Sequence, residues 1–362
     1  MGFGQRYKQW MYEWETRLTT RDTNRVVRPL DWGAKWTAEW PCRNGSRGLS
    51  NPEDVLIGLN QQILKSSDEF FSYRTPSDFR VELQSKSPNG NGVAKNSRGH
   101  AQFLRFTSAV ETPYAENNTV NARWFPARGR RAVVVLPQWN SDAEGHNGLC
   151  RIFNVLGISA LRLSLPYHDV RKPPEIERAD YAVSANIGRT IDAARQAVID
   201  VRCCLDWLDQ QGYLSLGIVG TSLGSCYAFI AAAHEPRLRT CVFNHASTYF
   251  ADVVWTGQST RQIRAGIEDK IDLDRLRQAW LAISPMSYFD AFQRYPRKSL
   301  LVYASYDLTF LPEFSQQIVD EFRRRQLDCK VAVLPCGHYS CGEAPFKYMD
   351  AWYMARFLEH AL

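Results

Sequence analysis

Short apolar runs rich in β-branched residues alternate with helix-length segments from about residue 101 to the end of the chain. The run RAVVVLP at 131–137 is continuously apolar, as expected for a strand buried on both faces of a sheet. The expected strands are FLRFTSAV (103–110), VNARWFP (120–126), RAVVVLP (131–137), ALRLSLP (160–166), LSLGIVG (214–220), TCVFNHA (240–246), SLLVYAS (299–305) and CKVAVLP (329–335). The main expected helices are at 186–211, 224–234, 312–326 and 345–361. This alternation predicts an α/β fold whose mostly parallel central sheet carries helices on both faces.

The chain divides by composition into an N-terminal extension and linker (1–100) and a larger domain (101–362). Within the larger domain, the stretch 247–297 interrupts the alternation and is long for a connection, so we expect an inserted cap there. In the extension, Trp32, Trp36 and Trp40 recur every four residues, which would put them on one face if that segment is helical. Such a face indicates packing on a neighbouring domain or subunit, and a homo-oligomer built through the extension is possible. The polar stretch QSKSPNGNGVAKNSRG (84–99) has the composition of a mobile linker.

Overall composition excludes several classes of protein. The 362 residues carry a net charge of only +6, which is too mild to indicate a nucleic-acid binder. We expect no transmembrane segment, because no apolar run approaches the roughly 18 residues that span a bilayer. The first residues, MGFGQRYKQW, show no secretory signal, so a cytoplasmic location is expected. The nine cysteines include no CxxC pair, which argues for reduced thiols rather than a zinc site or a disulfide framework.

The pentapeptide Gly220-Thr221-Ser222-Leu223-Gly224 lies where an expected buried strand meets an expected helix. G-x-S-x-G in that position is typical of a nucleophile elbow, a turn so tight that small residues must flank the serine. The competing interpretation is a glycine-rich turn in which Ser222 simply caps the helix. A nucleophilic serine also needs a base and an acid that orients the base, so the rest of the chain decides between them.

Asp307 and His338 supply those two groups in the required chain order. Asp307 follows the expected strand at 299–305, and His338 follows the expected strand at 329–335. Carboxyl ends of parallel strands share one edge of a sheet, so both side chains are expected beside Ser222. The earlier Asp252 is the alternative acid, but it lies six residues past its strand. We therefore predict a catalytic triad of Ser222, His338 and Asp307.

An oxyanion would need two backbone donors. The N–H of Leu223, directly after the nucleophile, is one expected donor. The second donor is expected from the loop LPQWN (136–140) at the end of that strand. Pro137 has no N–H, so Gln138 is the first choice for this donor and Trp139 is the second.

Three further histidines are weaker candidates for the site. His168 could line the entrance, although a turn is the favoured interpretation, and His245 is more simply a satisfied core histidine. His146 lies near two acidic residues but has no partner histidine at a ligand spacing, so no metal site is predicted.

Residues 101–362 resemble the α/β-hydrolase superfamily in the elbow GTSLG, the strand-end Asp307 and CGHYS around His338. Within it, LSLPYHDVRKP (163–173), LDWLDQQGYLSLGIVGTSLGS (205–225) and STYFADVVWTG (247–257) are similar to segments of the abhydrolase-domain-containing protein eighteen group. The resemblance implies an α/β-hydrolase fold. The chain departs from commoner hydrolases at LPQWN (136–140), where many have His-Gly.

These observations together favour a serine hydrolase that cleaves the ester or thioester bond of a small-molecule or lipid-like substrate. The mechanism would pass through an acyl-enzyme on Ser222 and would need no cofactor or metal. Acyl transfer to an acceptor other than water would use the same residues. A catalytically inactive fold acting as a binding protein is a third possibility, although such proteins generally lose a member of the triad, and here all three positions are filled.

Overall fold

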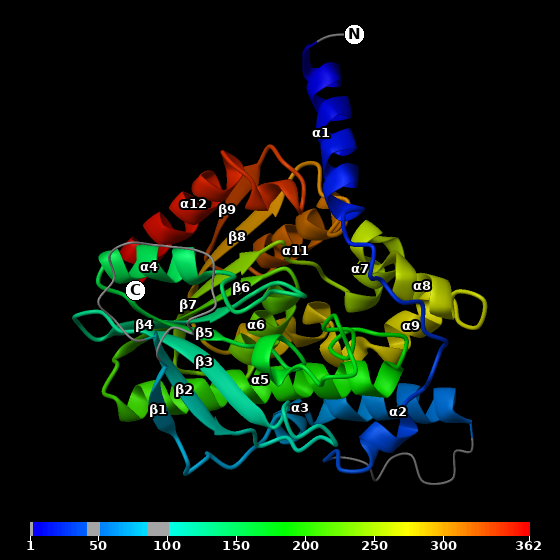
Figure 1. Cartoon of the computed structure of the whole chain (residues 1–362), viewed down its shortest axis with the longest axis horizontal. Coiled ribbons are helices and arrows are strands. Elements are labelled where there is room, and N and C mark those ends of the chain that lie inside the picture. The colour runs from blue at the N-terminus through cyan, green and yellow to red at the C-terminus, as the bar shows by residue number, and fades with distance from the viewer. Residues whose placement is uncertain (1–2, 42–50, 85–100) are drawn as a thin grey trace.

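One nine-stranded sheet organises the protein in the computed structural model, which describes residues 3–41, 51–84 and 101–362 (Figure 1). The strand order across the sheet is β1-β2-β3-β5-β4-β6-β7-β8-β9. The strands are β1 (Arg80–Gln84), β2 (Ala101–Thr107), β3 (Thr119–Phe125), β4 (Arg131–Leu136), β5 (Ser159–Leu163), β6 (Ser215–Thr221), β7 (Leu238–Asn244), β8 (Lys298–Ala304) and β9 (Cys329–Leu334). From β5 to β9 every neighbouring pair is parallel, whereas β1, β2 and β3 join antiparallel at one edge.

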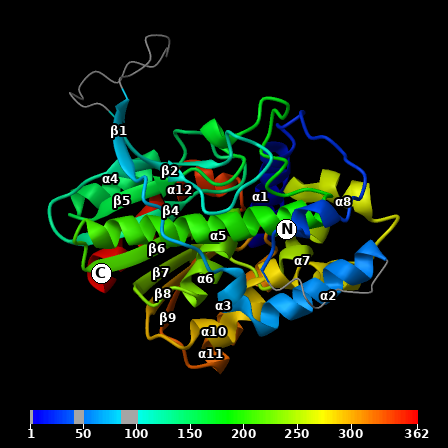
Figure 2. The same ribbon diagram turned by 90° about the horizontal axis from the view of Figure 1, so that it is seen from below.

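Helices cover both faces of the sheet, which explains why its central strands are apolar throughout. Along β4, Val133 and Val135 pack into one buried cluster while Val134 and Leu136 pack into the other. The first cluster is closed by α4 (Asn147–Val155) and α12 (Phe346–Ala361), and the second by α5 (Ile187–Gln210), α6 (Leu223–Ala233) and α11 (Pro312–Arg324). Figure 2 shows α5 lying across the sheet, with α6 beside it. Successive side chains of a strand point to opposite faces, so both had to be apolar.

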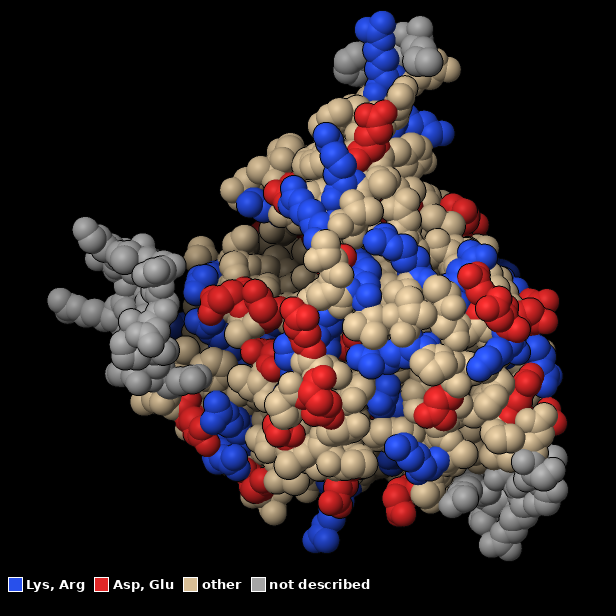
Figure 3. Space-filling model, turned by 45° about the vertical axis from the view of Figure 1, so that its right-hand side comes forward, with Lys and Arg blue, Asp and Glu red and all other residues tan. Residues whose placement is uncertain are grey.

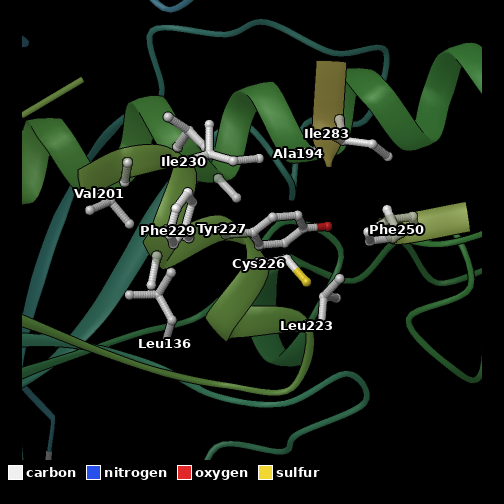
Figure 4. Close-up of a cluster of buried hydrophobic side chains, with 14 of the residues drawn as sticks. Leu136, Ala194, Val201, Leu223, Cys226, Tyr227, Phe229, Ile230, Phe250 and Ile283 are labelled. Atoms are coloured by element: carbon white, nitrogen blue, oxygen red, sulfur yellow. The ribbon is translucent and has the colours of Figure 1, made fainter. Parts of the chain in front are cut away.

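Helix α6 follows the elbow and is buried along its whole length. Its side chains meet those of α5 and β4, as drawn for Phe229, Ile230 and Leu136 in Figure 4. At one end of this cluster Leu223 and Cys226 lie close to Phe250. The packing of α6 therefore fixes the residues that directly follow Ser222.

The expected fold class is confirmed, and the expected strands match observed strands closely. Sequence analysis did not anticipate β1, which adds an outer antiparallel strand beside β2. All but the first residue of the stretch 84–99, expected to be a mobile linker, lies outside the described residues.

The N-terminal hundred residues pack on the sheet domain through separate short elements. These are α1 (Phe3–Thr19), the single 3₁₀ turn η1 (Ala34–Thr37), α2 (Pro52–Lys65) and α3 (Ser67–Phe70). The segment with three tryptophans is not a long helix: only one turn forms after Gly33, whose φ is 66°. Trp36 and Trp40 are nonetheless buried, and the Trp40 indole Nε1 donates to Asp192 of α5 at 2.8 Å. The tryptophans thus pack on the domain of their own chain.

The stretch between β7 and β8 contains no strand among its described residues. It forms α7 (Phe250–Thr256), α8 (Arg261–Ile267), α9 (Leu273–Ala279) and α10 (Phe289–Phe292), with 3₁₀ turns between them. Figure 1 shows α7, α8 and α9 beside the carboxyl ends of the central strands. Among the described helices, none combines the length and the apolar character needed to cross a membrane.

Candidate active site

Ser222 occupies a sharp turn between β6 and α6. Its φ of 56° lies in the left-handed region, which a residue other than glycine adopts at a cost in conformational energy. The turn places its hydroxyl at the carboxyl edge of the sheet, beside the first turn of α6. The backbone therefore presents Ser222 as a nucleophile elbow would, rather than as a simple helix cap.

The two glycines of the motif are required by close packing. A Cβ on Gly220 would lie 2.3 Å from the carbonyl oxygen of Gly224. A Cβ on Gly224 would lie 2.4 Å from the carbonyl oxygen of Leu136, at the end of β4. Both distances are far below van der Waals contact, so the elbow and the loop after β4 fit together only because these positions lack side chains.

A continuous line of hydrogen-bonding groups joins the three residues of the predicted triad. His338 Nε2 lies 3.0 Å from Ser222 Oγ, and His338 Nδ1 lies 2.8 Å from Asp307 Oδ2. Asp307 follows β8 and His338 follows β9, so adjacent parallel strands deliver both side chains to one edge. The ring of Phe310 stacks on the imidazole of His338, with 5.3 Å between centroids and 7° between planes. The structure thus brings together all three residues that the sequence pointed to.

The carboxylate of Asp307 is buried and fully engaged. Its Oδ1 accepts the backbone N–H groups of Thr309 and Phe310, each at 2.7 Å. Burial alone would raise the pKa of Asp307, but the neighbouring His338 and His245 side chains hold it well below its usual range. The carboxylate therefore stays ionised, as the partner of a base must.

His245 is a site residue that sequence reasoning assigned to the core. It follows β7, and its Nδ1 lies 2.9 Å from Asp307 Oδ2, the oxygen that also faces His338. Burial opposes protonation of His245, yet its bonds to Asp307 and to Cys341 raise its pKa well above the ordinary value. A second imidazole thus lies beside the triad, in surroundings that favour its protonated form. Its position at the end of a strand next to the elbow strand was the one signal in the sequence.

The three residues expected to donate to an oxyanion lie close to Ser222. Leu223, Gln138 and Trp139 all line the cavity beside Ser222. Within the described part of the chain, none of their backbone N–H groups makes a hydrogen bond to protein. The N–H of Asn140, by contrast, is taken by His168 Nε2 at 3.0 Å. Donors are thus free on both sides of the serine.

A cavity of about 830 Å³ opens onto Ser222 and His338. One side is apolar and is formed by α7 through Phe250, Val253 and Val254. Another side lies between α4 and α12 and includes Ile152 and Tyr348. Figure 3 shows the surface hollowed near the foot of the projecting N-terminal helix. The volume and the apolar lining suit a small organic ligand.

The remaining candidates have structural partners outside the triad. His168 is buried, with its Nδ1 2.8 Å from the carbonyl oxygen of Pro166, and holds the loop after β4 through Asn140. His146 Nε2 lies 3.0 Å from Thr221 Oγ1. Asp252 accepts from Arg277 Nε at 2.6 Å, whereas Asp307 is the aspartate that faces His338.

Three side chains near Ser222 have the atom types that can ligate a metal ion. Among the described residues, the cluster of possible ligands consists of His245, Asp307 and His338. Their Nδ1 and Oδ2 atoms already bind one another, so the arrangement fits proton chemistry better than metal ligation.

Comparison with known proteins places the fold. No family model and no curated protein matches the sequence. An acetyl xylan esterase of Paenibacillus sp. R4 superposes with a TM-score of 0.59 at 13% identity, covering 89% of this chain and 98% of its own. Acetyl xylan esterase 1 of Thermoanaerobacterium sp. JW/SL YS485 superposes with a TM-score of 0.57 at 14% identity, covering 100% of this chain and 99% of the esterase. An acylaminoacyl peptidase of Pyrococcus horikoshii superposes with a TM-score of 0.57 at 11% identity. That match covers 73% of this chain but only 41% of the longer peptidase.

The chain has the α/β-hydrolase fold. The sheet order, the parallel core from β5 to β9 and these superpositions agree on that assignment. In an α/β-hydrolase fold the nucleophile, acid and base follow strands of the sheet in the chain order that Ser222, Asp307 and His338 show. At such low identity the likeness extends to the fold alone.

Proposed function

We propose that the protein is a serine hydrolase that cleaves a carboxylic ester or thioester through an acyl-enzyme on Ser222. The observation that carries this proposal is the unbroken line Ser222–His338–Asp307, with distances of 3.0 and 2.8 Å, at the floor of the cavity. Free N–H groups on both sides of the serine support it, because an oxyanion needs such donors.

The reaction follows from the geometry. Ser222 Oγ attacks the acyl carbonyl while His338 Nε2 takes its proton, and the N–H groups of Leu223 and of Gln138 or Trp139 stabilise the oxyanion. His338 then donates that proton to the leaving group, and the acyl group stays on Ser222. Water, deprotonated by His338, attacks the acyl-enzyme and releases the acid. Asp307 fixes the imidazole tautomer and stabilises the imidazolium throughout.

The substrate is proposed to be a small-molecule or lipid-like ester. The stretch 247–297 would act as the cap, since its Phe250, Val253 and Val254 form the apolar side of the cavity. Both acetyl xylan esterases match over nearly their whole length and are named as esterases, which favours an ester over a peptide bond. The segments quoted above support kinship with the abhydrolase-domain-containing protein eighteen group. The cytoplasm is the proposed compartment, which imaging of the tagged full chain would test.

A fluorophosphonate probe tests the proposal directly. We expect the probe to label Ser222, as mapped by mass spectrometry, and Ser222→Ala to lose both the label and the turnover of p-nitrophenyl esters. The expected fold is unchanged, because alanine fits the tight elbow. Ser72→Ala, at an exposed serine outside the cavity, is the control and should keep labelling. Labelling elsewhere, or activity that survives Ser222→Ala, would contradict the mechanism.

Acyl transfer is the second candidate, since the same triad would serve an acceptor other than water. Measuring released acid against acylated acceptor, with and without added alcohols or thiols, separates the two reactions. Absence of any labelling in a folded protein would instead favour an inactive fold that binds a ligand.

A further inference from the structure

The N-terminal helix α1 reaches the loop that carries His338. Figure 1 shows most of α1 standing away from the body and its C-terminal end meeting the carboxyl edge of the sheet. At that end one face is buried, and it consists of Met11, Glu15, Leu18 and Thr19. Glu15 is fully buried, which is rare for a carboxylate and requires compensating hydrogen bonds.

Every compensating bond to the Glu15 carboxylate comes from the residues just after His338. Oε1 accepts the backbone N–H of Tyr339 at 2.6 Å. Oε2 accepts the backbone N–H and the hydroxyl of Ser340, both at 2.9 Å. Among the described residues Glu15 has no cationic partner, so the loop itself satisfies the buried charge. The carboxylate thereby holds the backbone on the C-terminal side of the histidine.

Gly337, the residue directly before His338, packs against the same carboxylate. A Cβ on Gly337 would lie 2.4 Å from Glu15 Cδ and Oε2, so only glycine leaves room for it. The N–H of Gly337 donates to Ser340 Oγ at 2.8 Å, and that hydroxyl lies on Glu15. Glu15, Gly337 and Ser340 thus form one unit around the base of the triad.

A simple anchoring role for Glu15 would not require this arrangement. Met11 already packs among the apolar side chains of β8, β9 and α12, and the Tyr7 hydroxyl donates to the carbonyl oxygen of Pro335. These contacts attach α1 without a buried charge. What the carboxylate adds is a fixed backbone at Tyr339 and Ser340, adjacent to an imidazole that must stay 3.0 Å from Ser222 Oγ. A displacement of about 1 Å at such a site costs about a hundredfold in rate.

We propose that Glu15 is a positioning residue for His338, which makes the N-terminal helix part of the catalytic unit. The proposal rests on the function proposed above. It gives the N-terminal extension a role within its own chain. It also explains the two residues that flank His338-Tyr339: Gly337 leaves space for the Glu15 carboxylate, and Ser340 donates to it.

Glu15→Gln tests the proposal with the smallest change in shape. The amide offers one acceptor oxygen and must turn its NH₂ group toward at least one of the loop donors, so a backbone bond is lost. We expect kcat for a p-nitrophenyl ester to fall about ten- to hundredfold with KM changed by less than about twofold, since the Glu15 side chain does not itself line the cavity. Glu13→Gln is the matched control, because Glu13 is exposed on the same helix and binds only Gln9. Equal kcat values for both variants and the unaltered protein would overturn the proposal.

Spectra of ¹⁵N-labelled histidine give a readout that needs no turnover. His245 and His338 both place Nδ1 on Asp307, but only His338 belongs to the loop that Glu15 holds. We expect Glu15→Gln to weaken or broaden the Nδ1–H signal of His338 and to leave that of His245 in place. Loss of both signals together would indicate general unfolding and contradict a positioning role.

Ser340→Ala extends the test should Glu15→Gln fold poorly. It removes the hydroxyl bond to Glu15 and the acceptor of the Gly337 N–H but keeps both backbone donors to Glu15. We therefore expect a smaller fall in kcat with the same selective change at His338. An unchanged kcat and an unchanged His338 signal in Ser340→Ala would count against the proposal. If the unaltered protein turns over no ester at all, the proposed function fails, and the histidine spectra still decide the positioning role.

Discussion

His245 and His338 place their Nδ1 atoms on the same oxygen, Asp307 Oδ2, at 2.9 and 2.8 Å. Their ring centroids are 4.6 Å apart. A carboxylate that accepts two imidazole N–H groups on one oxygen divides its charge between them, so the state of His245 affects how well Asp307 stabilises a positive His338.

His245→Asn removes the charge of this second imidazole and keeps a donor near its Nδ1 position. Asparagine also tolerates the left-handed backbone, where φ is 54°. The groups that face His245 are Asp307, His338, Cys341 and Asp350. Without the imidazolium, protonation of His338 becomes easier, so we expect the acidic limb of the kcat/KM profile to move to higher pH. His360→Asn, at an exposed histidine of α12, is the control. A limb that stays in place or moves to lower pH would contradict this coupling.

Asp307→Asn and Asp252→Asn separate the two candidate acids. We expect Asp307→Asn to lower the acylation rate by about 10⁴, as the equivalent change does in serine proteases, because the imidazole then adopts the wrong tautomer. Asp252 contacts Arg277 rather than a histidine, so its substitution should cost far less activity. Stopped-flow acylation of one ester by both variants gives the ranking, and the reverse order would move the acid to Asp252.

The fold and the meeting of the three candidate residues were predictable because both depend on local patterns. Continuous apolar runs mark strands buried on both faces, and the expected run at 131–137 became β4 (Arg131–Leu136). Residues at the carboxyl ends of parallel strands must meet at one edge, so chain order was enough to join Ser222, Asp307 and His338.

The missed features depend on contacts that local patterns do not record. Glu15 lies 324 positions before Tyr339 in the chain, and a glutamate on an amphipathic helix reads as a surface residue. The spacing of Trp32, Trp36 and Trp40 predicted a helical face, but the backbone turns at Gly33. A Cβ there would lie 2.2 Å from the Asn186 side chain, so packing against α5 overrides the helical period.

The burial of His168 predicts that the protein loses stability in acid. Burial lowers its pKa to about 4, so the folded state holds the imidazole neutral while the unfolded chain protonates near pH 6.5. Its contribution is therefore complete above about pH 6.5 and is lost as the pH falls toward 4, amounting to about 3 kcal/mol. Burial raises the pKa of Asp350 to about 6, so protonation of Asp350 stabilises the folded state as the pH falls and opposes the effect of His168.

The measurement compares unfolding free energies at pH 7 and pH 4.5 for the unaltered protein and for His168→Gln. We expect the variant to be less stable at pH 7 and to lose less stability on acidification. A loss equal to that of the unaltered protein would show that His168 does not carry the dependence.

Trp255 and Trp280 belong to the stretch 247–297, whose aromatic residues could either line a pocket or pack onto the sheet, and neither contributes to the cavity wall. Trp280 is fully buried, packs edge-on to Phe250 and donates its indole N–H to the carbonyl oxygen of Ile187 at 3.3 Å. We therefore expect Trp280→Phe to lower the free energy of unfolding, and Trp280→Ala to lower it by about 3–5 kcal/mol, as measured by urea denaturation. Unchanged stability would refute its role as a core residue.

Val254 offers the sharper test of the cap, because its side chain is buried on α7 and faces the cavity near Ser222. Val254→Phe puts a larger side chain on the apolar side of a cavity of about 830 Å³ and so reduces the space there. Binding of a long acyl chain should therefore weaken more than binding of a short one. We expect the ratio of kcat/KM for p-nitrophenyl acetate to that for the octanoate to rise about tenfold, which corresponds to about 1.4 kcal/mol of lost binding. Trp255→Phe, on the same helix and outside the cavity wall, is the matched control and should leave the ratio unchanged. If Val254→Phe lowers both activities equally, the acyl chain occupies the side between α4 and α12, and the cap holds the leaving group.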